Sequence, residues 1–371
     1  MAKNVKPRSK ALKITAHVAR MTMGLIFIGS GFVKAIDPWG TAIKVDEYIQ
    51  IYGLEQLRSI SMWISIWLSC AELLMGCMLT FKVRIRFVSI FALLSMSSFT
   101  VVSLLSATVL PVEDCGCFGA AIRLTPWQTF YKNLLLLPMA FVIWYRYRPD
   151  KIFSFKKLEL LLATTFFSIS MGIGLYCYRH LPLIDFLPYR VGVNLPKAIE
   201  DAKRMGVGDV ETILVYRNIN TGKLREFGIN DEQWHDSTKW KWVETKTITE
   251  EPTIMPLISE FSLVDADNKD VTMELITAEG VVNMLFVTSL DLSISNRDCF
   301  VRLSKFAREA ASRGERVICV TPDTLDSDGC YFGIEGYNID PTTMKTVLRA
   351  NTGLFRLRDG VIERKSNCWD L

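Results

Sequence analysis

Five apolar runs dominate the first half of the chain, and each is close to the ~20 residues that a helix needs to cross a bilayer. The first run follows a basic N-terminus and has no cleavage site of small residues, so we expect it to remain as a membrane span. The sequence therefore predicts a bundle of five membrane helices. The runs cover Met21–Ile36, Ile60–Thr80, Phe87–Leu110, Trp127–Tyr145 and Leu158–Tyr176.

The composition indicates that a soluble part is joined to these spans. Hydrophobic residues make up 50% of the 371 residues, yet 22% are charged, which is too many for a chain embedded entirely in a membrane. A net charge of +4 without a basic face or a recognition motif argues against nucleic-acid binding. Nine cysteines without paired CxxC spacing, and only three histidines, argue against a metal site.

Basic residues lie mainly on one side of the predicted spans. The N-terminal tail and the loops after the second and fourth spans hold fourteen Lys or Arg, whereas the first and third loops hold three. The positive-inside rule therefore places the tail in the cytoplasm. We expect an inner-membrane protein whose 37–58 loop, third loop and residues after 180 lie in the periplasm, an oxidising space where disulfides persist.

Two cysteines one residue apart, Cys115 and Cys117, lie in the predicted third loop. A disulfide between them would close a very small ring, so it would be reduced more easily than a structural bridge. Gly116 lets the backbone bend enough to close that ring. Two interpretations stay open here: two thiols in a tight turn, or a redox-active pair. Asp114 beside them would raise the pKa of a thiol when ionised and would accept a proton during exchange.

Glu72 is an ionisable residue in the middle of the second predicted span, so it should face the interior of the bundle. It is either a proton carrier for thiol or quinone chemistry or a carboxyl held by Lys34 or by polar groups such as Asn133 and Gln128. Both interpretations stay open. Cys177 lies at the outer end of the fifth span, at the predicted depth of the external cysteine pair, and is a candidate redox relay.

The part after residue 180 reads as two modules. Residues 181–256 are predicted to be a small β module with a hairpin and a third strand. Residues 257–371 alternate strands and helices and close with a hairpin whose Asp359-Gly360 turn is a strong signal, so we expect an α/β sandwich. The expected elements are strands at Thr212–Tyr216, Lys223–Phe227, Trp240–Val243, Phe261–Val264, Val281–Thr288 and Arg316–Val320, helices at Arg297–Ala311 and from Asp340-Pro341 through Leu348, and the hairpin strands Leu354–Leu357 and Val361–Arg364.

Three motifs resemble the DoxX/MauE superfamily of four-span membrane proteins. They are Gly29-Ser30-Gly31-Phe32-Val33-Lys34, Glu72-Leu73-Leu74-Met75-Gly76 and Cys115-Gly116-Cys117-Phe118-Gly119. The whole chain resembles Bacteroidetes-type DoxX family proteins fused to an extracytoplasmic domain, with the junction carried by Asp185–Asn194. The resemblance divides the chain into a four-helix membrane domain at 1–150, a fifth membrane helix at 151–180, the β module at 181–256 and a thioredoxin-like domain at 257–371.

This resemblance implies redox work at disulfides. MauE-type proteins are implicated in disulfide handling during maturation of exported enzymes, and DoxX proteins are associated with quinone-linked oxidation of sulfur compounds. The implied function is a thiol–disulfide oxidoreductase that exchanges disulfides with exported client proteins, with a quinone as candidate cofactor. The alternative is a non-catalytic subunit or scaffold of a cell-envelope complex, in which the degenerate thioredoxin-like domain serves for docking.

The C-terminal domain departs from a thioredoxin active site. Residues 289–296, which follow the first buried strand, contain no cysteine, so the domain reads as degenerate. Cys299 is predicted near the first turn of a helix, where the helix dipole favours the thiolate. It is a candidate relay, or else a half-buried structural cysteine. Cys330 and Cys368 are predicted to form a structural disulfide in the oxidising compartment.

Overall fold

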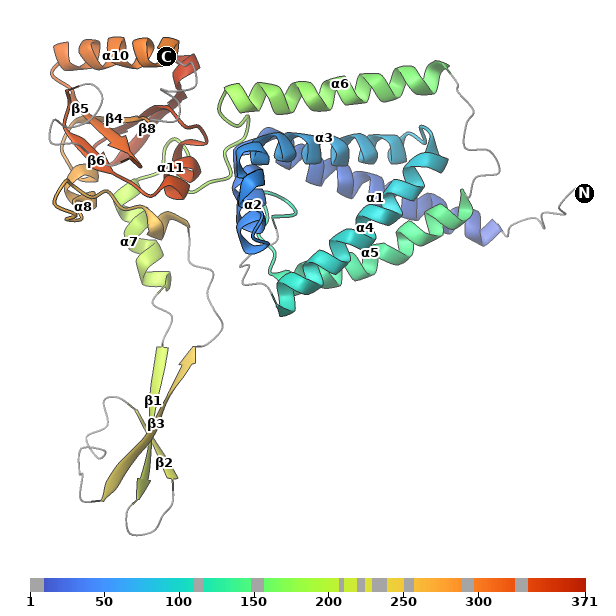
Figure 1. The fold of residues 1–371 in the computed structure, drawn as a ribbon, viewed down its shortest axis with the longest axis horizontal. Helices are drawn as coiled ribbons and strands as arrows, with labels where there is room; N and C mark the ends of the chain where they lie inside the picture. The colour runs from blue at the N-terminus through green and yellow to red at the C-terminus, as the bar shows by residue number, and fades with distance from the viewer. Residues whose placement is uncertain are drawn as a thin grey trace, which may run out of the picture. The chain divides into compact units, whose positions relative to one another are not determined.

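The computed structural model describes residues 10–109, 116–147, 157–206, 210–218, 224–228, 239–249, 257–288, 297–323 and 333–371. Contacts divide the chain into two compact units, the first made of residues 1–192 with 262–371 and the second of residues 193–261 (Figure 1). The larger unit therefore combines the predicted membrane helices with the α/β region near the C-terminus.

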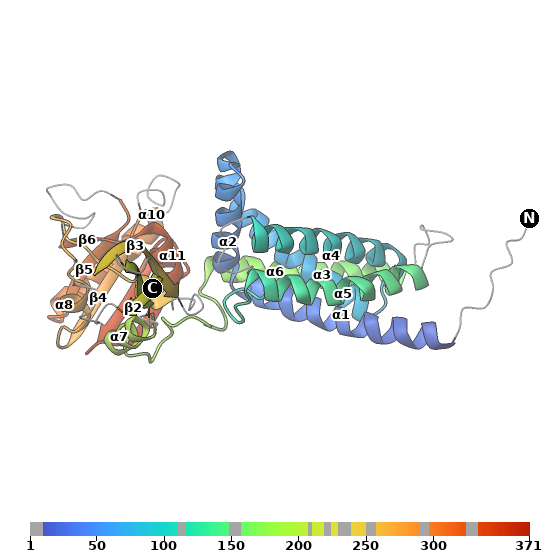
Figure 2. The ribbon, with the colours of Figure 1, turned by 90° about the horizontal axis from the view of Figure 1, so that it is seen from below.

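Long helices lie side by side in the first part of the larger unit (Figure 2). Helix α1 packs on α3 and α5, α4 packs on α5, and α3 packs on α6. The stretch 37–58, expected to be a loop, is instead helical and connects α1 to α3. The bounds are α1 Lys10–Ile36, α2 Pro38–Ile51, the 3-10 helix η1 Glu55–Ile60, α3 Ser61–Thr80, α4 Ile85–Thr108, α5 Pro126–Arg146 and α6 Lys157–Arg179.

Four of these segments are long and apolar enough to cross a membrane, namely α1, η1 joined to α3, α4 and α6. They coincide with four of the five predicted spans, and they identify a membrane protein. The remaining prediction, Trp127–Tyr145, forms helix α5 but does not reach the same hydropathy. The reason lies in its first two turns, which carry Gln128, Lys132 and Asn133.

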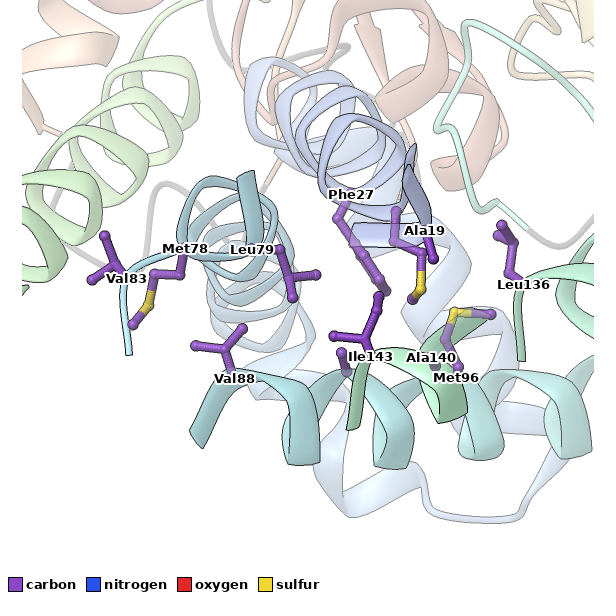
Figure 3. Close-up of a cluster of buried hydrophobic side chains, with 12 residues drawn as sticks. Ala19, Phe27, Met78, Leu79, Val83, Val88, Met96, Leu136, Ala140 and Ile143 are labelled. Carbon is purple, nitrogen blue, oxygen red and sulfur yellow. The ribbon is translucent and has the colours of Figure 1, made fainter. Parts of the chain in front are cut away.

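Buried apolar side chains hold α1, α3, α4 and α5 together (Figure 3). Small and flexible residues make up much of this cluster, so the helices approach closely and the methionines fill irregular gaps. The cluster consists of Ala19, Met23, Phe27, Met78, Leu79, Val83, Val88, Ala92, Met96, Leu136, Ala140 and Ile143.

Basic residues gather at one end of the bundle. The Arg20 guanidinium is buried and donates to the carbonyl oxygens of Leu79 and Thr80, the second at 2.6 Å, so it caps the C-terminal end of α3. The Lys82 ammonium and the Arg146 guanidinium lie 5.8 and 5.4 Å from the ring centre of Tyr147. The cations that sequence analysis assigned to one side of the membrane therefore lie together in space.

A mixed sheet of five strands forms the α/β domain of the larger unit, in the order β6-β5-β4-β7-β8. Strand β4 is parallel to β5 and antiparallel to β7, β5 is parallel to β6, and β7 is antiparallel to β8. The bounds are α8 Thr272–Ile276, β4 Val281–Phe286, α10 Arg297–Ser312, β5 Arg316–Thr321, β6 Gly336–Asn338, α11 Pro341–Leu348, β7 Gly353–Arg358, β8 Val361–Asn367 and the 3-10 helix η4 Cys368–Asp370.

Local signals placed most of these elements correctly. Asp340 caps α11 by accepting a 2.8 Å hydrogen bond from the Thr343 amide, and Pro341 follows it at the first turn, as predicted. The predicted strand Phe261–Val264 is wrong, because only Val264 pairs, through isolated bridges to Asp270 and Asn338.

Two ion pairs and a histidine–carboxylate hydrogen bond join the α/β domain to the helical bundle and the segment that follows α6. Arg349 Nε lies 3.1 Å from Asp37 Oδ1, and Lys365 Nζ lies 2.8 Å from Asp185 Oδ2. Burial lowers the pKa of the Lys365 ammonium, while Asp185 acts in the opposite direction. His180 Nδ1 lies 2.6 Å from a carboxylate oxygen of Asp370.

The second unit contains helix α7, Leu195–Gly206, and a three-stranded antiparallel sheet in the order β2-β1-β3. The strands are β1 Val210–Asn218, β2 Leu224–Gly228 and β3 Trp240–Thr249, followed by the 3-10 helix η3, Leu257–Glu260. The predicted hairpin and third strand are confirmed by the pairing of β1 with both neighbours.

Candidate functional site

Glycines bring α1 and α3 into close backbone contact. A Cβ atom at Gly31 would clash with the Leu73 backbone, and one at Gly76 would meet the Ile28 amide at 2.5 Å. A Cβ atom at Gly24 would clash with the Thr80 side chain. Small residues at such positions let membrane helices approach closely. Because of this contact, the side chains next to Gly31 on α1 pack against the middle of α3.

The close approach places a buried ion pair between the two helices. Lys34 Nζ lies 2.6 Å from Glu72 Oε1 and 2.8 Å from Glu72 Oε2, and the two residues are 6% and 3% exposed. Lys34 is one of the partners that sequence analysis offered for Glu72. Asn133, another, donates instead to the carbonyl oxygen of Phe99 and to Ser103. The pair satisfies a carboxylate that would be very costly to bury alone.

Ser30 connects this ion pair to the cysteine motif. Its hydroxyl oxygen lies 2.7 Å from Glu72 Oε2 and 2.7 Å from the backbone carbonyl oxygen of Cys117, so its single proton has two acceptors within reach. Asp114 and Cys115, the other predicted members of the site, lie outside the described residues.

A cavity of about 160 Å³ opens between α1, α2, α3, α4, α5 and the segment 116–118. Its walls are mainly apolar. The polar side chains among them include the Lys34–Glu72 ion pair and Asn133. We call this space the inner cavity. The side chains that line it are Met23, Ile26, Phe27, Ser30, Lys34, Thr41, Lys44, Val45, Tyr48, Leu68, Glu72, Met96, Phe99, Val102, Cys117, Phe118, Lys132, Asn133 and Leu136, with Gly116.

The segment beside the inner cavity depends on glycine and on two lysines. Gly116 has a φ of +62°, and a Cβ atom there would lie 3.0 Å from the Lys44 side chain. Lys44 forms an ion pair of 2.9 Å with Glu47 on the same helix. The Lys132 ammonium lies 4.9 Å from the ring centre of Phe118. Residues 116–118 therefore lie beside the aliphatic part of Lys44 and the ammonium of Lys132.

Cys177 does not line the inner cavity. It is fully buried near the end of α6, whereas Cys117 lines the inner cavity. Cys70, on α3, faces α6 instead, with its sulfur 4.0 Å from the Phe167 carbonyl oxygen. The predicted exchange between Cys177 and the motif stays a prediction.

The predicted disulfide between Cys330 and Cys368 is wrong, because Cys368 is bonded to Cys299. The physical reason is that η4 packs against α10, which brings the two Cα atoms to 5.2 Å. Cys299 is therefore not a thiolate at a helix terminus. Cys319 is disulfide-bonded as well, and Cys330 lies outside the described residues.

A charged cluster on the sheet of the α/β domain has a structural role. Glu315 accepts hydrogen bonds from Arg313, Asn283 and Arg356, which together lower its pKa to about 2 against the opposing effect of burial. Arg356 also pairs with Glu363 at 2.7 Å. These partners connect β4, β5, β7 and β8, which are far apart in the sequence. The cluster therefore stabilises the sheet and provides no reactive group.

Sequence analysis missed several members of the inner cavity. Ser30 was noted only as part of a motif, although a hydroxyl between two glycines of a membrane helix was a usable signal. Lys44 was counted only as a loop charge. Tyr48, whose hydroxyl lies 3.3 Å from Ser106, and Lys132 had no assigned role. Among the described residues, no three His, Cys, Asp or Glu side chains gather as a metal ion would require.

Comparison with known proteins gives one match. The family model described as methylamine utilisation protein MauE matches residues 12–146, which run from the third residue of α1 to the end of α5 and include every residue that lines the inner cavity. This finding supports the predicted resemblance over those residues. No curated protein and no solved structure matches the chain.

Proposed function

We propose that this chain is a membrane-bound thiol–disulfide redox protein that uses Cys115 and Cys117 to exchange disulfides with exported proteins. The observation that carries the proposal is the position of Ser30, within 2.7 Å of both Glu72 and the Cys117 carbonyl oxygen. A buried carboxylate thus lies one side chain away from the cysteine motif. Such an arrangement suits a site where protons must be moved when thiols are oxidised.

The exchange consists of two balanced steps. A client thiolate attacks the disulfide between Cys115 and Cys117, so that the intramolecular S–S bond breaks and a mixed disulfide forms. The second client thiolate attacks the mixed disulfide, which leaves the client with an S–S bond and the motif with two thiols. Oxidising the motif again removes two electrons and two protons. Asp114 is proposed to accept a proton in the exchange, and Glu72 to take one during reoxidation.

A quinone is the proposed electron acceptor, because it takes up two electrons and two protons in becoming a quinol. The inner cavity fits the ring of such a group: apolar walls from Phe27, Met96 and Phe99 surround it, and Lys34 provides a donor for a carbonyl oxygen. Its volume of about 160 Å³ is below the ~300–1,000 Å³ of typical ligand pockets, so only a ring would be enclosed. Lys34 would orient that ring, and the side chains around it would exclude water.

The proposed topology places the cysteine motif and the α/β domain in the periplasm. Support comes from the end of the bundle that holds Arg20, Lys82 and Arg146, which is the basic end and should be cytoplasmic. Helix α5 is then also a span, the fourth along the chain, because it begins near the cysteine motif and ends beside Lys82. The N-terminus is accordingly cytoplasmic.

The α/β domain is proposed to be thioredoxin-like. Its order β5-β4-β7-β8, with β4 parallel to β5 and the last two strands antiparallel, supports this assignment, while β6 extends the edge. The domain lacks cysteines in 289–296, so we propose that it receives or positions the client rather than carrying the redox pair.

The experiment is the oxidation of a two-cysteine peptide by the purified full chain with a short-chain quinone in detergent. We expect one quinol for each peptide disulfide. Replacing Cys115→Ser or Cys117→Ser should abolish turnover, and one of the two variants should trap the peptide as a mixed disulfide. Glu72→Gln should slow reoxidation about 10²-fold without preventing the trapped complex, if it moves a proton.

The matched control is Cys77→Ser, since Cys77 lies on α3 but not in the inner cavity. This variant should oxidise the peptide at the wild-type rate. Wild-type turnover by the Cys115→Ser, Cys117→Ser double variant would refute the proposal.

A further inference from the structure

A second and larger cavity, of about 800 Å³, lies where the helical bundle contacts the α/β domain within the larger unit. We call it the outer cavity. Its volume is within the ~300–1,000 Å³ range of small-molecule sites, whereas the inner cavity is smaller. One wall is made by α2, η1 and the adjoining ends of α3 and α6. The opposite wall comes from α11, β8 and η4 and includes Lys345, Asn367 and Trp369.

Helix α2 separates the two cavities. Thr41, Lys44, Val45 and Tyr48 line the inner cavity, while Trp39, Ala42, Ile43 and Asp46 line the outer one. Each set has the spacing i, i+3, i+4, i+7, which places its members on one face of a helix. The outer cavity is therefore a separate site and not an extension of the inner one.

Aromatic side chains that line the outer cavity lie at the ends of the candidate membrane helices, where the membrane–water interface is expected. Trp39 stacks on Tyr178 at 6.1 Å between ring centres, and Trp63 lies 6.2 Å from the same ring. Trp63 lies in the first turn of α3, and Tyr178 lies in the last turn of α6, so both are at ends of candidate membrane helices. Trp and Tyr are enriched at this depth, where lipid headgroups meet the hydrocarbon. The cavity thus opens where headgroups lie.

The charges around the outer cavity favour an anion. Arg58, Arg179 and Lys345 line it, against the single carboxylate of Asp46. Guanidinium groups match phosphate oxygens in geometry and charge. At a membrane surface, the anion that best matches these three cations is therefore a phosphate group.

Two residues that line the outer cavity each carry an enclosed polar atom, which a change of side-chain rotamer would turn towards a ligand. Trp39 Nε1 and Asp46 Oδ1 are buried and have no hydrogen-bond partner within the described part of the chain. An unmet buried donor or acceptor costs roughly 1–3 kcal/mol, so a ligand that supplies the partner gains affinity. Trp39 needs an acceptor oxygen, and Asp46 needs a donor such as a hydroxyl or an ammonium.

We propose that the outer cavity binds the headgroup of a membrane phospholipid that carries a hydrogen-bond donor. The phosphate lies against Arg58, Arg179 and Lys345, Trp39 donates to an oxygen, and Asp46 accepts from an ammonium or hydroxyl. The acyl chains pass along the ends of α3 and α6 into the bilayer. Such a lipid bridges the bundle and the α/β domain. This inference is independent of the redox function proposed above.

The test uses the full chain, delipidated in detergent, with dioctanoyl phosphatidylethanolamine, phosphatidylglycerol and phosphatidylcholine as probes. Native mass spectrometry reports complexes, and the melting temperature reports stabilisation by ligand binding. Phosphatidylethanolamine and phosphatidylglycerol should bind about tenfold more tightly than phosphatidylcholine, whose headgroup has no donor. Equal binding of all three lipids would overturn the proposal.

Variants separate the site from general lipid binding. The Arg58→Gln, Arg179→Gln pair should weaken both preferred lipids about tenfold, and Asp46→Asn should weaken phosphatidylethanolamine by a similar factor. The Arg84→Gln, Arg86→Gln pair is the matched control, because these residues lie beside the turn between α3 and α4, away from the outer cavity. Effects of the control as large as those of the site variants would contradict the assignment.

A small soluble molecule could carry the same phosphate and hydrogen-bond donor as a lipid headgroup. Phosphoethanolamine and glycerol 3-phosphate, which lack acyl chains, should bind at least about tenfold more weakly than the lipids, because no apolar surface is buried. Equal affinity for these soluble compounds would overturn the lipid assignment.

Discussion

Arg349 of the α/β domain and Asp37 of the helical bundle form a buried ion pair, with 3.1 Å between Nε and Oδ1. Their side chains are 4% and 6% exposed, so neither charge is screened by water. Asp37 also caps α2 by accepting a 2.9 Å hydrogen bond from the Gly40 amide. The docking of the domain and the start of α2 therefore depend on one carboxylate.

Removing the arginine should destabilise the full chain strongly. Arg349→Met leaves the Asp37 carboxylate buried without its cation, which costs about 3–5 kcal/mol. Adding Asp37→Asn should recover part of the loss, because no charge is then left uncompensated. Thermal unfolding in detergent provides the measurement. Arg358→Met, which breaks an exposed pair with Glu363, is the control and should change the melting temperature little.

The glycine contact between α1 and α3 should tolerate no side chain. Gly31→Val places branched carbons against the Leu73 backbone, so we expect a loss of at least about 1–3 kcal/mol and separation of Lys34 from Glu72. Gly29→Val is the matched control, because a Cβ atom at Gly29 has nothing within 4 Å. Equal yields and melting temperatures for the two variants would show that the close approach is unnecessary.

Glu315 should make stability depend on acid pH. Its pKa falls from 4.5 to about 2 on folding, so the stability it contributes is complete above the unfolded value and is lost as the pH falls towards 2. Glu315→Gln should therefore lower the free energy of unfolding by about 1–3 kcal/mol at pH 7 and by much less near pH 2. Urea unfolding at several pH values tests this, with the exposed Glu279→Gln as control. A constant difference across the range would contradict it.

The Cys299–Cys368 disulfide should stabilise the α/β domain. It joins residues 69 apart, for which the chain-entropy model gives about 4 kcal/mol. Peptide mass mapping without reductant should recover this pair. Cys299→Ser and Cys368→Ser should each lower the melting temperature by a similar amount, since either change breaks the same bond. Recovery of Cys368 paired with Cys330 would contradict the assignment.

Hydrophobic length and local capping signals predicted much of the fold. Runs of about 20 apolar residues marked four membrane segments, and Asp340-Pro341 marked the start of α11. The same Asp-Pro signal occurs at Asp37-Pro38, where it begins α2. That signal was usable, but apolar residues are spread around α2, which hides the amphipathic pattern by which a surface helix is recognised.

The site was only partly predictable because its members meet through tertiary contacts. Glu72 was recognisable in the sequence as a charged residue within an apolar run, and Lys34 was one of the partners predicted for it. Ser30 gave a weaker signal, its position between two glycines, and a serine in a helix ordinarily bonds its own backbone. The partner of Cys368 also required the folded structure, because η4 returns to α10 only after the whole sheet has formed.

Because α2 supplies a wall to both cavities, a ligand in one space shares a boundary with a ligand in the other. A shift of the α2 backbone by an outer occupant would move Thr41 and Lys44 together with Trp39 and Asp46, because all four belong to the same helical turns. Thermodynamic reciprocity then requires the two binding free energies to change by equal amounts. A lipid that shifts α2 would thereby change the affinity of the inner cavity, and an inner occupant that shifts α2 would change the affinity for the lipid by the same factor.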